Sequence, residues 1–263
     1  MKYVLVTGAY GGMGQAAVHL LQSRGYTVFA LDLKAVPEQE RVIPVVADIT
    51  DASSLQKALA FVRSVSCSLH AIIHFAGVYI LDSLIEISEQ KFTNAFDINV
   101  FGAYRVNKIF APLLQRGSKI VITTSELAPL EPLPFTGLYA VTKSALDKYA
   151  SSLRMEMQLL GIKVCILRPG AVKTNMLGVS TNQLDSFCQN TNLYACNAKK
   201  FRQIVERVEA KNVSAELVAS KVASILQAKK VRPVYSLNRN PLLLLLNVLP
   251  KTLQMRIIRM LIK

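Results

Sequence analysis

The segment Thr7-Gly8-Ala9-Tyr10-Gly11-Gly12-Met13-Gly14 lies between an apolar run at residues 3–7 and a helical pattern at Gln15–Arg24. The run is rich in β-branched residues, which predicts a strand, and the glycines predict a tight turn into the helix. Backbone N–H groups at such a turn, with the positive end of the helix, suit a pyrophosphate. Glycine loops also form ligand-free turns, so the loop alone leaves both interpretations open.

A second apolar strand, Thr27–Leu31, follows Gly25 and ends at Asp32. A carboxylate at this strand end accepts both ribose hydroxyls of NAD and repels the 2′-phosphate of NADP. Tyr10 is not basic, and Lys34 is the only cation just after Asp32. We therefore expect NAD(H) to be preferred over NADP(H).

The alternation of apolar strands and helices continues along the chain, which predicts an α/β fold with a single doubly wound parallel sheet of the Rossmann type, covered on both faces. The predicted strands are 43–47, 71–74, 119–124, 163–167 and 232–236, and the predicted helices are 52–63, 139–160 and several within 89–116. Asp48, after the third strand, is expected to contact the adenine. The alternative is that it caps the helix that starts at Ala52.

Two regions depart from this pattern. Residues 174–212 are polar and weakly periodic, which favours a mobile lid-like insertion over an active site, although an ordinary surface excursion has the same pattern. Residues 241–263 form a basic apolar appendage, so we predict one catalytic domain at 1–240 followed by this segment.

Tyr139 and Lys143 are four residues apart on a predicted helix, which places both side chains on one face. An ammonium group near a phenol lowers the phenol pKa, so Tyr139 is predicted to be the acid/base. Ser125 follows a strand at its carboxyl end and can hold a substrate oxygen, with Thr124 as a rival hydroxyl. Asn99 is expected to relay protons through water to Lys143. Tyr–Lys pairs at this spacing are common in helices, so the prediction depends on the pair occurring together with Ser125 and Asn99.

The chain resembles the short-chain dehydrogenase/reductase family in its compact form, whose motifs are TGxxxGxG, an Asn on the central helix, a catalytic Ser and YxxxK. The resemblance covers roughly residues 1–175 and implies a catalytic set of Asn99, Ser125, Tyr139 and Lys143. The resemblance also implies a set of cofactor-binding residues within or next to these motifs. They are Gly8, Tyr10, Gly12, Met13, Gly14, Asp32, Asp48, Ala76, Gly77, Tyr139, Lys143, Pro169, Gly170 and Thr174. Among these, Pro169, Gly170 and Thr174 correspond to the family's nicotinamide-binding segment.

One motif departs from the family pattern. The usual Asn-Asn-Ala-Gly appears here as His74-Phe75-Ala76-Gly77, so an asparagine that ordinarily braces the sheet is absent. We expect His74 to be a neutral imidazole in a backbone hydrogen-bond network, outside the chemistry.

The composition excludes several classes of protein. The four cysteines form no C-x-x-C pair, which argues against zinc, a redox dithiol or any other metal site, and favours reduced thiols in a cytoplasmic protein. Met1 leads directly into a strand without a leader pattern, so we do not expect export. Of the net charge of +14, residues 199–263 contribute +11, with 14 Lys/Arg against 3 Asp/Glu.

The basic end is too short for an ordinary transmembrane helix, since the leucine-rich segment 242–249 lies between two prolines. Helical spacing places Arg256, Arg259 and Lys263 on one stripe, opposite a broad apolar surface formed by Leu253, Ile257, Ile258, Met260, Leu261 and Ile262. This pattern favours peripheral contact with an anionic membrane. Packing on the protein's own core or on a sister subunit is the alternative. Nucleic-acid binding is disfavoured because the region lacks aromatic residues.

The expected function is NAD(H)-dependent interconversion of a secondary alcohol and a ketone by a homodimer or homotetramer. The resemblance to members acting on steroids, retinoids or other lipids, together with the apolar tail, favours a hydrophobic substrate. Two other classes remain open. One is a non-catalytic NAD(H)-binding redox sensor that docks on membranes or partners, and the other is a nucleotide-sugar epimerase or dehydratase, which usually needs a longer substrate domain.

Overall fold

The computed structural model describes residues 1–34, 36–209 and 211–263. Its centre is a parallel sheet, as the sequence predicts, and the strands lie in the order β3-β2-β1-β4-β5-β6-β9. The strands are β1 (Lys2–Thr7), β2 (Tyr26–Asp32), β3 (Val42–Val46), β4 (Leu69–His74), β5 (Leu114–Thr123), β6 (Lys163–Pro169) and β9 (Val234–Leu237). The order reverses between β1 and β4, and ligands of such sheets bind at this switch point, beyond the carboxyl ends of the strands.

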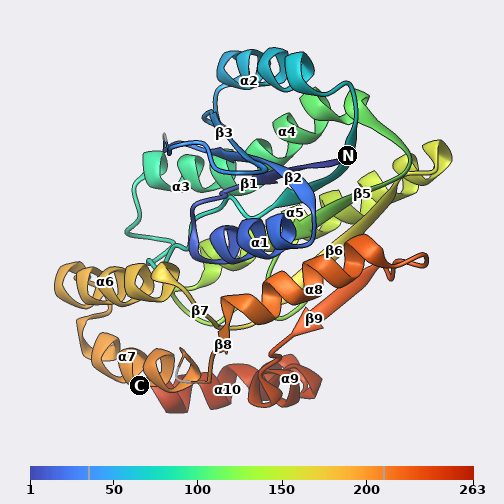
Figure 1. The fold of residues 1–263 in the computed structure, drawn as a ribbon. Helices are drawn as coiled ribbons and strands as arrows, with labels where there is room; N and C mark the ends of the chain where they lie inside the picture. Colours follow the sequence, from blue (N-terminus) through green and yellow to red (C-terminus); the bar gives the residue numbers. More distant parts are fainter. Residues whose placement is uncertain (35, 210) are drawn as a thin grey trace.

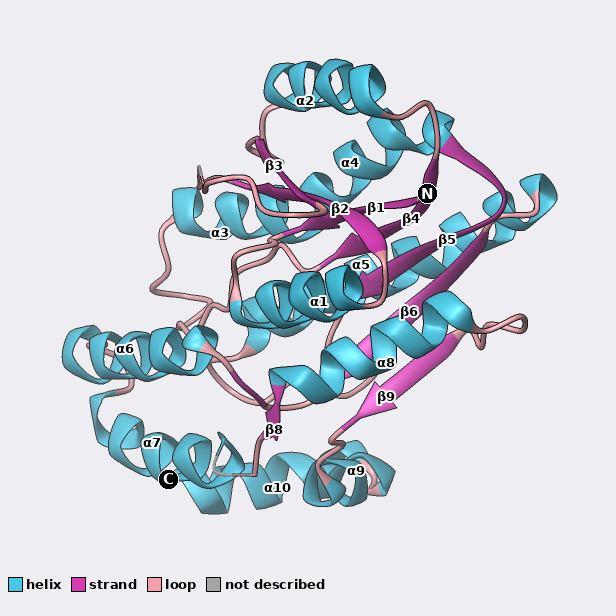
Figure 2. Cartoon of the chain, viewed as in Figure 1, coloured by secondary structure: helices cyan, strands magenta, loops and turns pink. Residues whose placement is uncertain are grey.

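Helices cover both faces of the sheet (Figures 1 and 2). One face is covered by α1 (Gly12–Ser23) and α8 (Ala215–Gln227), and the other by α2 (Ala52–Val65), α4 (Gly102–Phe110) and α5 (Gly137–Met157). Alternate residues of β1 show the principle, because Leu5 packs into one core while Val4 and Val6 pack into the other. The strands are therefore apolar on both sides, which is why they appear in the sequence as continuous apolar runs.

The predicted helical region 89–116 is divided. It comprises α3 (Glu89–Phe96), a π-helical turn η1 (Asp97–Phe101), α4 and a 3-10 turn η2 (Ala111–Leu113), and β5 already begins at Leu114. The 3-10 turn η3 (Gln158–Leu160) ends α5. Pro112, within η2, has no N–H to donate, which ends the helix before the expected boundary.

The region 174–212, for which we predict a lid-like insertion, contains two helices. These are α6 (Asn175–Asn190) and α7 (Ala195–Glu209), flanked by the short paired strands β7 (Val172–Lys173) and β8 (Val213–Ser214). Leu184, Phe187, Phe201 and Val205 form a small core of their own with Leu81. The weak periodicity of the sequence concealed this core because its apolar residues are few and come from two separate helices.

Two polar contacts attach these helices to the loop after β4. The Gln183 side chain accepts the N–H of Leu81 at 2.9 Å and donates to the carbonyl of Tyr79 at 2.8 Å. The Glu86 carboxylate accepts the hydroxyl of Thr191 at 2.7 Å and the N–H of Asn192 at 2.8 Å. The helices are thereby held over the carboxyl ends of the strands.

The C-terminal segment forms two further helices, α9 (Pro241–Val248) and α10 (Lys251–Ile262), and α10 lies between α7 and α9 in Figure 1. Ile262 packs against the small core, and its carbonyl accepts a hydrogen bond from Asn197 at 3.1 Å. Ile257 and Ile258 are half-buried, so part of the expected outer apolar surface of α10 instead turns toward the protein. No helix in the described ranges has both the length and the apolar character needed to cross a membrane.

Candidate active site

The glycine loop forms the turn between β1 and α1. Gly8 has a φ of +64°, and a Cβ there would lie 2.6 Å from the nitrogen of Ala76. A Cβ on Gly14 would lie 2.0 Å from the carbonyl oxygen of Gly8, so the loop and the helix can meet this closely only without side chains. Gly11, the N-cap of α1, provides no side-chain cap, which leaves the positive helix end open to an anion.

Asp32 lies at the carboxyl end of β2, beside the glycine loop. One carboxylate oxygen accepts the N–H of Tyr10 at 2.9 Å and the other accepts the N–H of Leu33 at 2.8 Å. The Tyr10 hydroxyl is buried and has no hydrogen-bond partner within the described part of the chain. Asp48 accepts two hydrogen bonds from Thr50, and Asp51 rather than Asp48 caps α2, so the capping alternative for Asp48 is wrong.

These groups surround a cavity of about 540 Å³. It combines an open helix end for a pyrophosphate, a carboxylate for ribose hydroxyls and an unsatisfied phenol hydroxyl, so the residues present fit a nicotinamide dinucleotide. The predicted cofactor residues that line it are Gly8, Tyr10, Gly12, Met13, Gly14, Asp32, Asp48, Ala76, Gly77 and Thr174.

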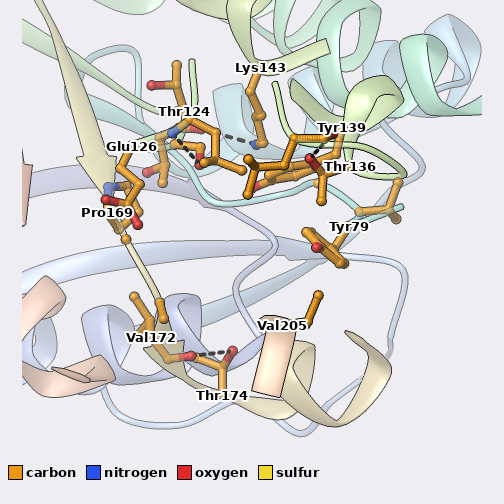
Figure 3. Close-up of a pocket in the computed structure, with 18 of the residues that line it drawn as sticks. Tyr79, Thr124, Glu126, Thr136, Tyr139, Lys143, Pro169, Val172, Thr174 and Val205 are labelled. Atoms are coloured by element: carbon orange, nitrogen blue, oxygen red, sulfur yellow. Dashed lines mark hydrogen bonds between the residues drawn. The ribbon is translucent and has the colours of Figure 1, made fainter. Parts of the chain in front are cut away.

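A second cavity, of about 160 Å³, lies next to the first and holds the predicted proton-transfer residues. In Figure 3, Tyr139 and Lys143 lie on one wall, while Val172, Thr174 and Val205 lie opposite. Ser125, Pro169 and Gly170 also line this cavity. Both cavities are lined by Met13, Gly77, Tyr79 and Thr174, so a cofactor in the first would border a substrate in the second.

Tyr139 and Lys143 are both buried on the inner face of α5. The Lys143 Nζ lies 5.7 Å from the centroid of the Tyr139 ring and donates to the carbonyl of Thr123 at 3.4 Å. Burial lowers the pKa of Lys143 to about 8. Burial raises the pKa of Tyr139 to about 12, opposed by a hydrogen bond from Ser125. The phenol pKa is thus raised and not lowered, because desolvation outweighs the hydrogen bond from Ser125.

The hydroxyl groups of Ser125 and Thr124, the two candidates for holding the substrate oxygen, have different hydrogen-bond partners. The hydroxyl of Thr124 donates to the carboxylate of Asp147 at 3.1 Å, and this carboxylate also accepts two hydrogen bonds from Arg168. The hydroxyl of Ser125 instead hydrogen-bonds with Tyr139. The geometry favours Ser125 as the hydroxyl that works with the phenol.

Asn99 lies in the π-helical turn and is buried behind Gly77, outside both cavity walls. Its carboxamide oxygen accepts the N–H of Val78 at 2.8 Å, and its nitrogen donates to the carbonyl of Val78 at 2.9 Å and the hydroxyl of Thr142 at 3.0 Å. The side chain thus joins the loop after β4 to α5, and a relay role toward Lys143 stays a prediction.

His74 is fully buried, and burial lowers its pKa to about 4, so the imidazole is neutral as expected. Its partner differs from the expectation. The Nε2 atom lies 2.9 Å from the Oδ1 of Asn107, whose nitrogen donates to the hydroxyl of Tyr149 at 3.2 Å. A chain of side chains, rather than a backbone network, braces this part of the sheet.

Several residues that line the second cavity were not identified from the sequence, and Tyr79, Glu126, Phe201 and Leu243 are among them. The Tyr79 ring packs against the Tyr139 ring with centroids 4.8 Å apart. Glu126 accepts the N–H of Asn240 at 2.7 Å, and burial raises the pKa of this carboxyl. The position of Glu126 directly after Ser125 was an available signal, whereas nothing local marks Phe201 or Leu243.

Comparison with known proteins agrees with this geometry. The profile of a family described as short chain dehydrogenase matches residues 2–185. Estradiol 17-beta-dehydrogenase 2 of Mus musculus is 32% identical over 191 residues, which cover 67% of this chain and 50% of that protein. The 3-ketodihydrosphingosine reductase of Bacteroides thetaiotaomicron is 23% identical over 229 residues, which cover 87% of this chain and 84% of that protein.

The fold has solved counterparts. The crystal structure of a short chain dehydrogenase family protein from Francisella tularensis aligns with a TM-score of 0.75 at 22% identity, covering 91% of this chain and 98% of that one. The chain described here spans only half the length of the mouse relative.

Proposed function

Because this chain belongs to the short-chain dehydrogenase/reductase family, we propose that it interconverts a secondary alcohol and a ketone with NAD(H). The observation that carries the proposal is the shared wall of the two cavities, where Gly77 and Thr174 border both the glycine-loop site and the site of Tyr139. When bound, the cofactor supplies or accepts the hydride. The residues of the chain then supply the binding, the orientation and the proton.

In the direction of ketone reduction, the Tyr139 hydroxyl donates its proton to the carbonyl oxygen as that oxygen becomes an alcohol. The Ser125 hydroxyl holds the same oxygen in place, and Lys143 binds the cofactor's nicotinamide ribose and carries charge near the phenol. A phenol pKa of about 12 keeps Tyr139 protonated at neutral pH, which is the state that reduction requires. Alcohol oxidation requires the opposite state, so it should become faster as the pH rises.

The preference for NAD(H) over NADP(H) is supported by Asp32. Its carboxylate lines the first cavity beside the glycine loop, where the 2′-phosphate of NADP would meet like charge. Lys34, the nearest following cation in the sequence, is exposed and also lines this cavity. Asp32→Ala should narrow the preference, measured as the ratio of kcat/KM for the two cofactors.

A hydrophobic, steroid-, retinoid- or lipid-like substrate is supported by the walls of the second cavity. Its side chains are largely apolar and include Phe75, Val78, Leu133, Phe201, Ile204 and Leu243. The names of two relatives include estradiol, a steroid, and 3-ketodihydrosphingosine, a lipid with a long alkyl chain and a polar amino-alcohol end. Assembly as a homodimer or homotetramer belongs to the same proposal, and exposed Phe101 and Met155 offer apolar surface for it.

The test follows NADH absorbance with a panel of apolar and polar ketones and alcohols. Tyr139→Phe should abolish turnover while leaving NADH affinity within a few-fold, and Lys143→Ala should reduce both turnover and affinity. Tyr104→Phe, on the exposed side of α4, is the matched control and should behave as the parent protein. Near-normal turnover by Tyr139→Phe would exclude the mechanism. NADH binding without turnover of any substrate would favour the redox-sensor alternative.

A further inference from the structure

The outer side of α9 presents large apolar side chains to solvent. Leu242, Leu245 and Val248 recur every three residues, and their exposed fractions are 68%, 64% and 82%. The same helix turns Leu243 inward, where it is buried and lines the substrate cavity. Thus α9 separates the cavity from an exposed apolar surface.

The outer side of α10 combines cations with apolar side chains. Arg256, Arg259 and Lys263 are exposed and lie on one helical stripe. Met255, exposed at 70%, lies on one side of this stripe, and Met260, exposed at 72%, lies on the other. Gln254, on the opposite side of the helix, is buried, which fixes the direction in which the stripe points.

The charge of this surface has one sign. Residues 241–263 contain four Lys/Arg and no Asp or Glu. Lys251 pairs with Glu131 at 2.9 Å, whereas Arg256, Arg259 and Lys263 form no ion pair with any residue that the structure describes. Three cations therefore remain available to an external partner. The C-terminal face, as we name it, consists of Leu242, Leu245, Val248, Leu253, Met255, Arg256, Arg259, Met260 and Lys263.

We propose that the C-terminal face docks on an anionic lipid bilayer. Exposed leucine and methionine side chains suit the boundary between headgroups and acyl chains, and unpaired cations on the same side suit anionic headgroups. A two-fold contact with a second copy would set the basic stripes against each other, which disfavours that occupant. A nucleic acid is disfavoured because residues 236–263 contain no aromatic side chain for base stacking.

Docking in this way would place the substrate cavity close to the membrane. Leu243 is on the inner side of α9 and Leu242 on its outer side, so one helix, about 10 Å across, separates the lipid from the cavity wall. The advantage for an apolar substrate rests on the proposed function. The docking itself does not, because it needs only the exposed side chains.

The test measures co-sedimentation of the full chain with vesicles of phosphatidylcholine, with and without phosphatidylserine. We expect binding to the anionic vesicles, weak binding to the others, and partial release when salt is raised from about 0.1 M to about 1 M, which shortens the Debye length from about 10 Å to about 3 Å. A variant combining Arg256→Gln, Arg259→Gln and Lys263→Gln should lose about a hundredfold in affinity, at about fivefold per cation.

A second variant combines Leu242→Ser, Leu245→Ser and Val248→Ser, and should lose about tenfold or more in affinity. Its matched control combines Leu159→Ser and Leu160→Ser, two exposed leucines after α5, and should bind as the parent protein. Circular dichroism and NADH binding show that each variant is folded. The proposal would be overturned if the full-length protein did not co-sediment with anionic vesicles. It would also be overturned if the Leu159→Ser, Leu160→Ser control lost as much vesicle affinity as the α9 variant.

Activity is measured separately on a water-soluble ketone without vesicles. A protein that binds vesicles but turns over no ketone would support the docking proposal and contradict the proposed function. A protein that turns over a ketone but binds no vesicles would support the proposed function and contradict the docking proposal.

Discussion

Burial of Lys143 should make the cofactor-free protein less stable than a variant without this charge. The pKa of Lys143 falls from 10.5 to about 8 because its ammonium group is desolvated, and at about 1.4 kcal/mol per pKa unit the shift corresponds to about 3 kcal/mol. Below pH 8 the group is charged in both folded and unfolded states, so the full penalty is present at pH 7. It disappears as the pH rises from about 8 to 10.5.

The perturbation is Lys143→Met, which removes the charge and shortens the unbranched side chain by one atom. It also removes the weak hydrogen bond to Thr123, at a cost of about 1 kcal/mol, so a net gain of about 2 kcal/mol is expected at pH 7. Urea denaturation of the cofactor-free protein at pH 7 and at pH 10 measures the free energy of unfolding. The difference in the free energy of unfolding between the variant and the parent protein should be smaller at pH 10 than at pH 7.

The control is Lys148→Met, an exposed position on the same helix, which should change the free energy of unfolding by less than about 0.5 kcal/mol. A Lys143→Met variant less stable than its parent at pH 7, or a gap that does not depend on pH, would refute the reasoning. The same variant should be inactive, which would mean that Lys143 lowers the stability of the folded protein and is required for its activity.

Three further changes have defined outcomes. Gly14→Ala places a Cβ 2.0 Å from the Gly8 carbonyl oxygen, so NADH affinity measured by fluorescence should collapse. Gly117→Ala, where a Cβ meets nothing within 4 Å but the φ of +93° strains any side chain, should lower stability and leave NADH affinity intact. His74 has a folded pKa of about 4 against 6.5 unfolded, so stability should fall by up to about 3 kcal/mol as the pH drops through this window, and His74→Gln should flatten that dependence in urea titrations. Arg168→Met leaves the carboxylate of Asp147, 13% exposed, without its bidentate partner, and should cost about 3 kcal/mol in urea, most of it recovered by adding Asp147→Asn.

The sequence predicted the sheet, and it predicted residues that line one cavity around the glycine loop, because the signals for both are local. A strand such as β1 is buried on both faces and is therefore a continuous apolar run, and the glycines of the loop are adjacent in the chain. The sequence separation of Tyr139 and Lys143 also predicts their arrangement, because both residues are on one helix and four residues apart on its inner face.

Other features depend on partners that are distant in the chain. His74 reaches Asn107, 33 residues away, and Gln183 reaches Leu81, 102 residues away. The phenol pKa depends on how completely Tyr139 is enclosed, which no spacing expresses. On α10, the helical pattern placed the cations correctly but could not tell which isoleucines face α7.

The π-helical turn at Asp97–Phe101 sets the position of Asn99 without setting the register of the helices around it. A turn of this kind holds one residue more than the regular helix on either side of it, and its wider winding absorbs that residue. Deleting a single residue here would restore a regular helix and leave α3 and α4 close to their present register, so Val106 and Phe110 would keep their places in the core. The side chains of the turn itself would be re-aimed, and Asn99 would lose its hydrogen bonds to Val78 and Thr142. A one-residue deletion in this turn should thus leave the protein folded and detach the loop after β4 from α5.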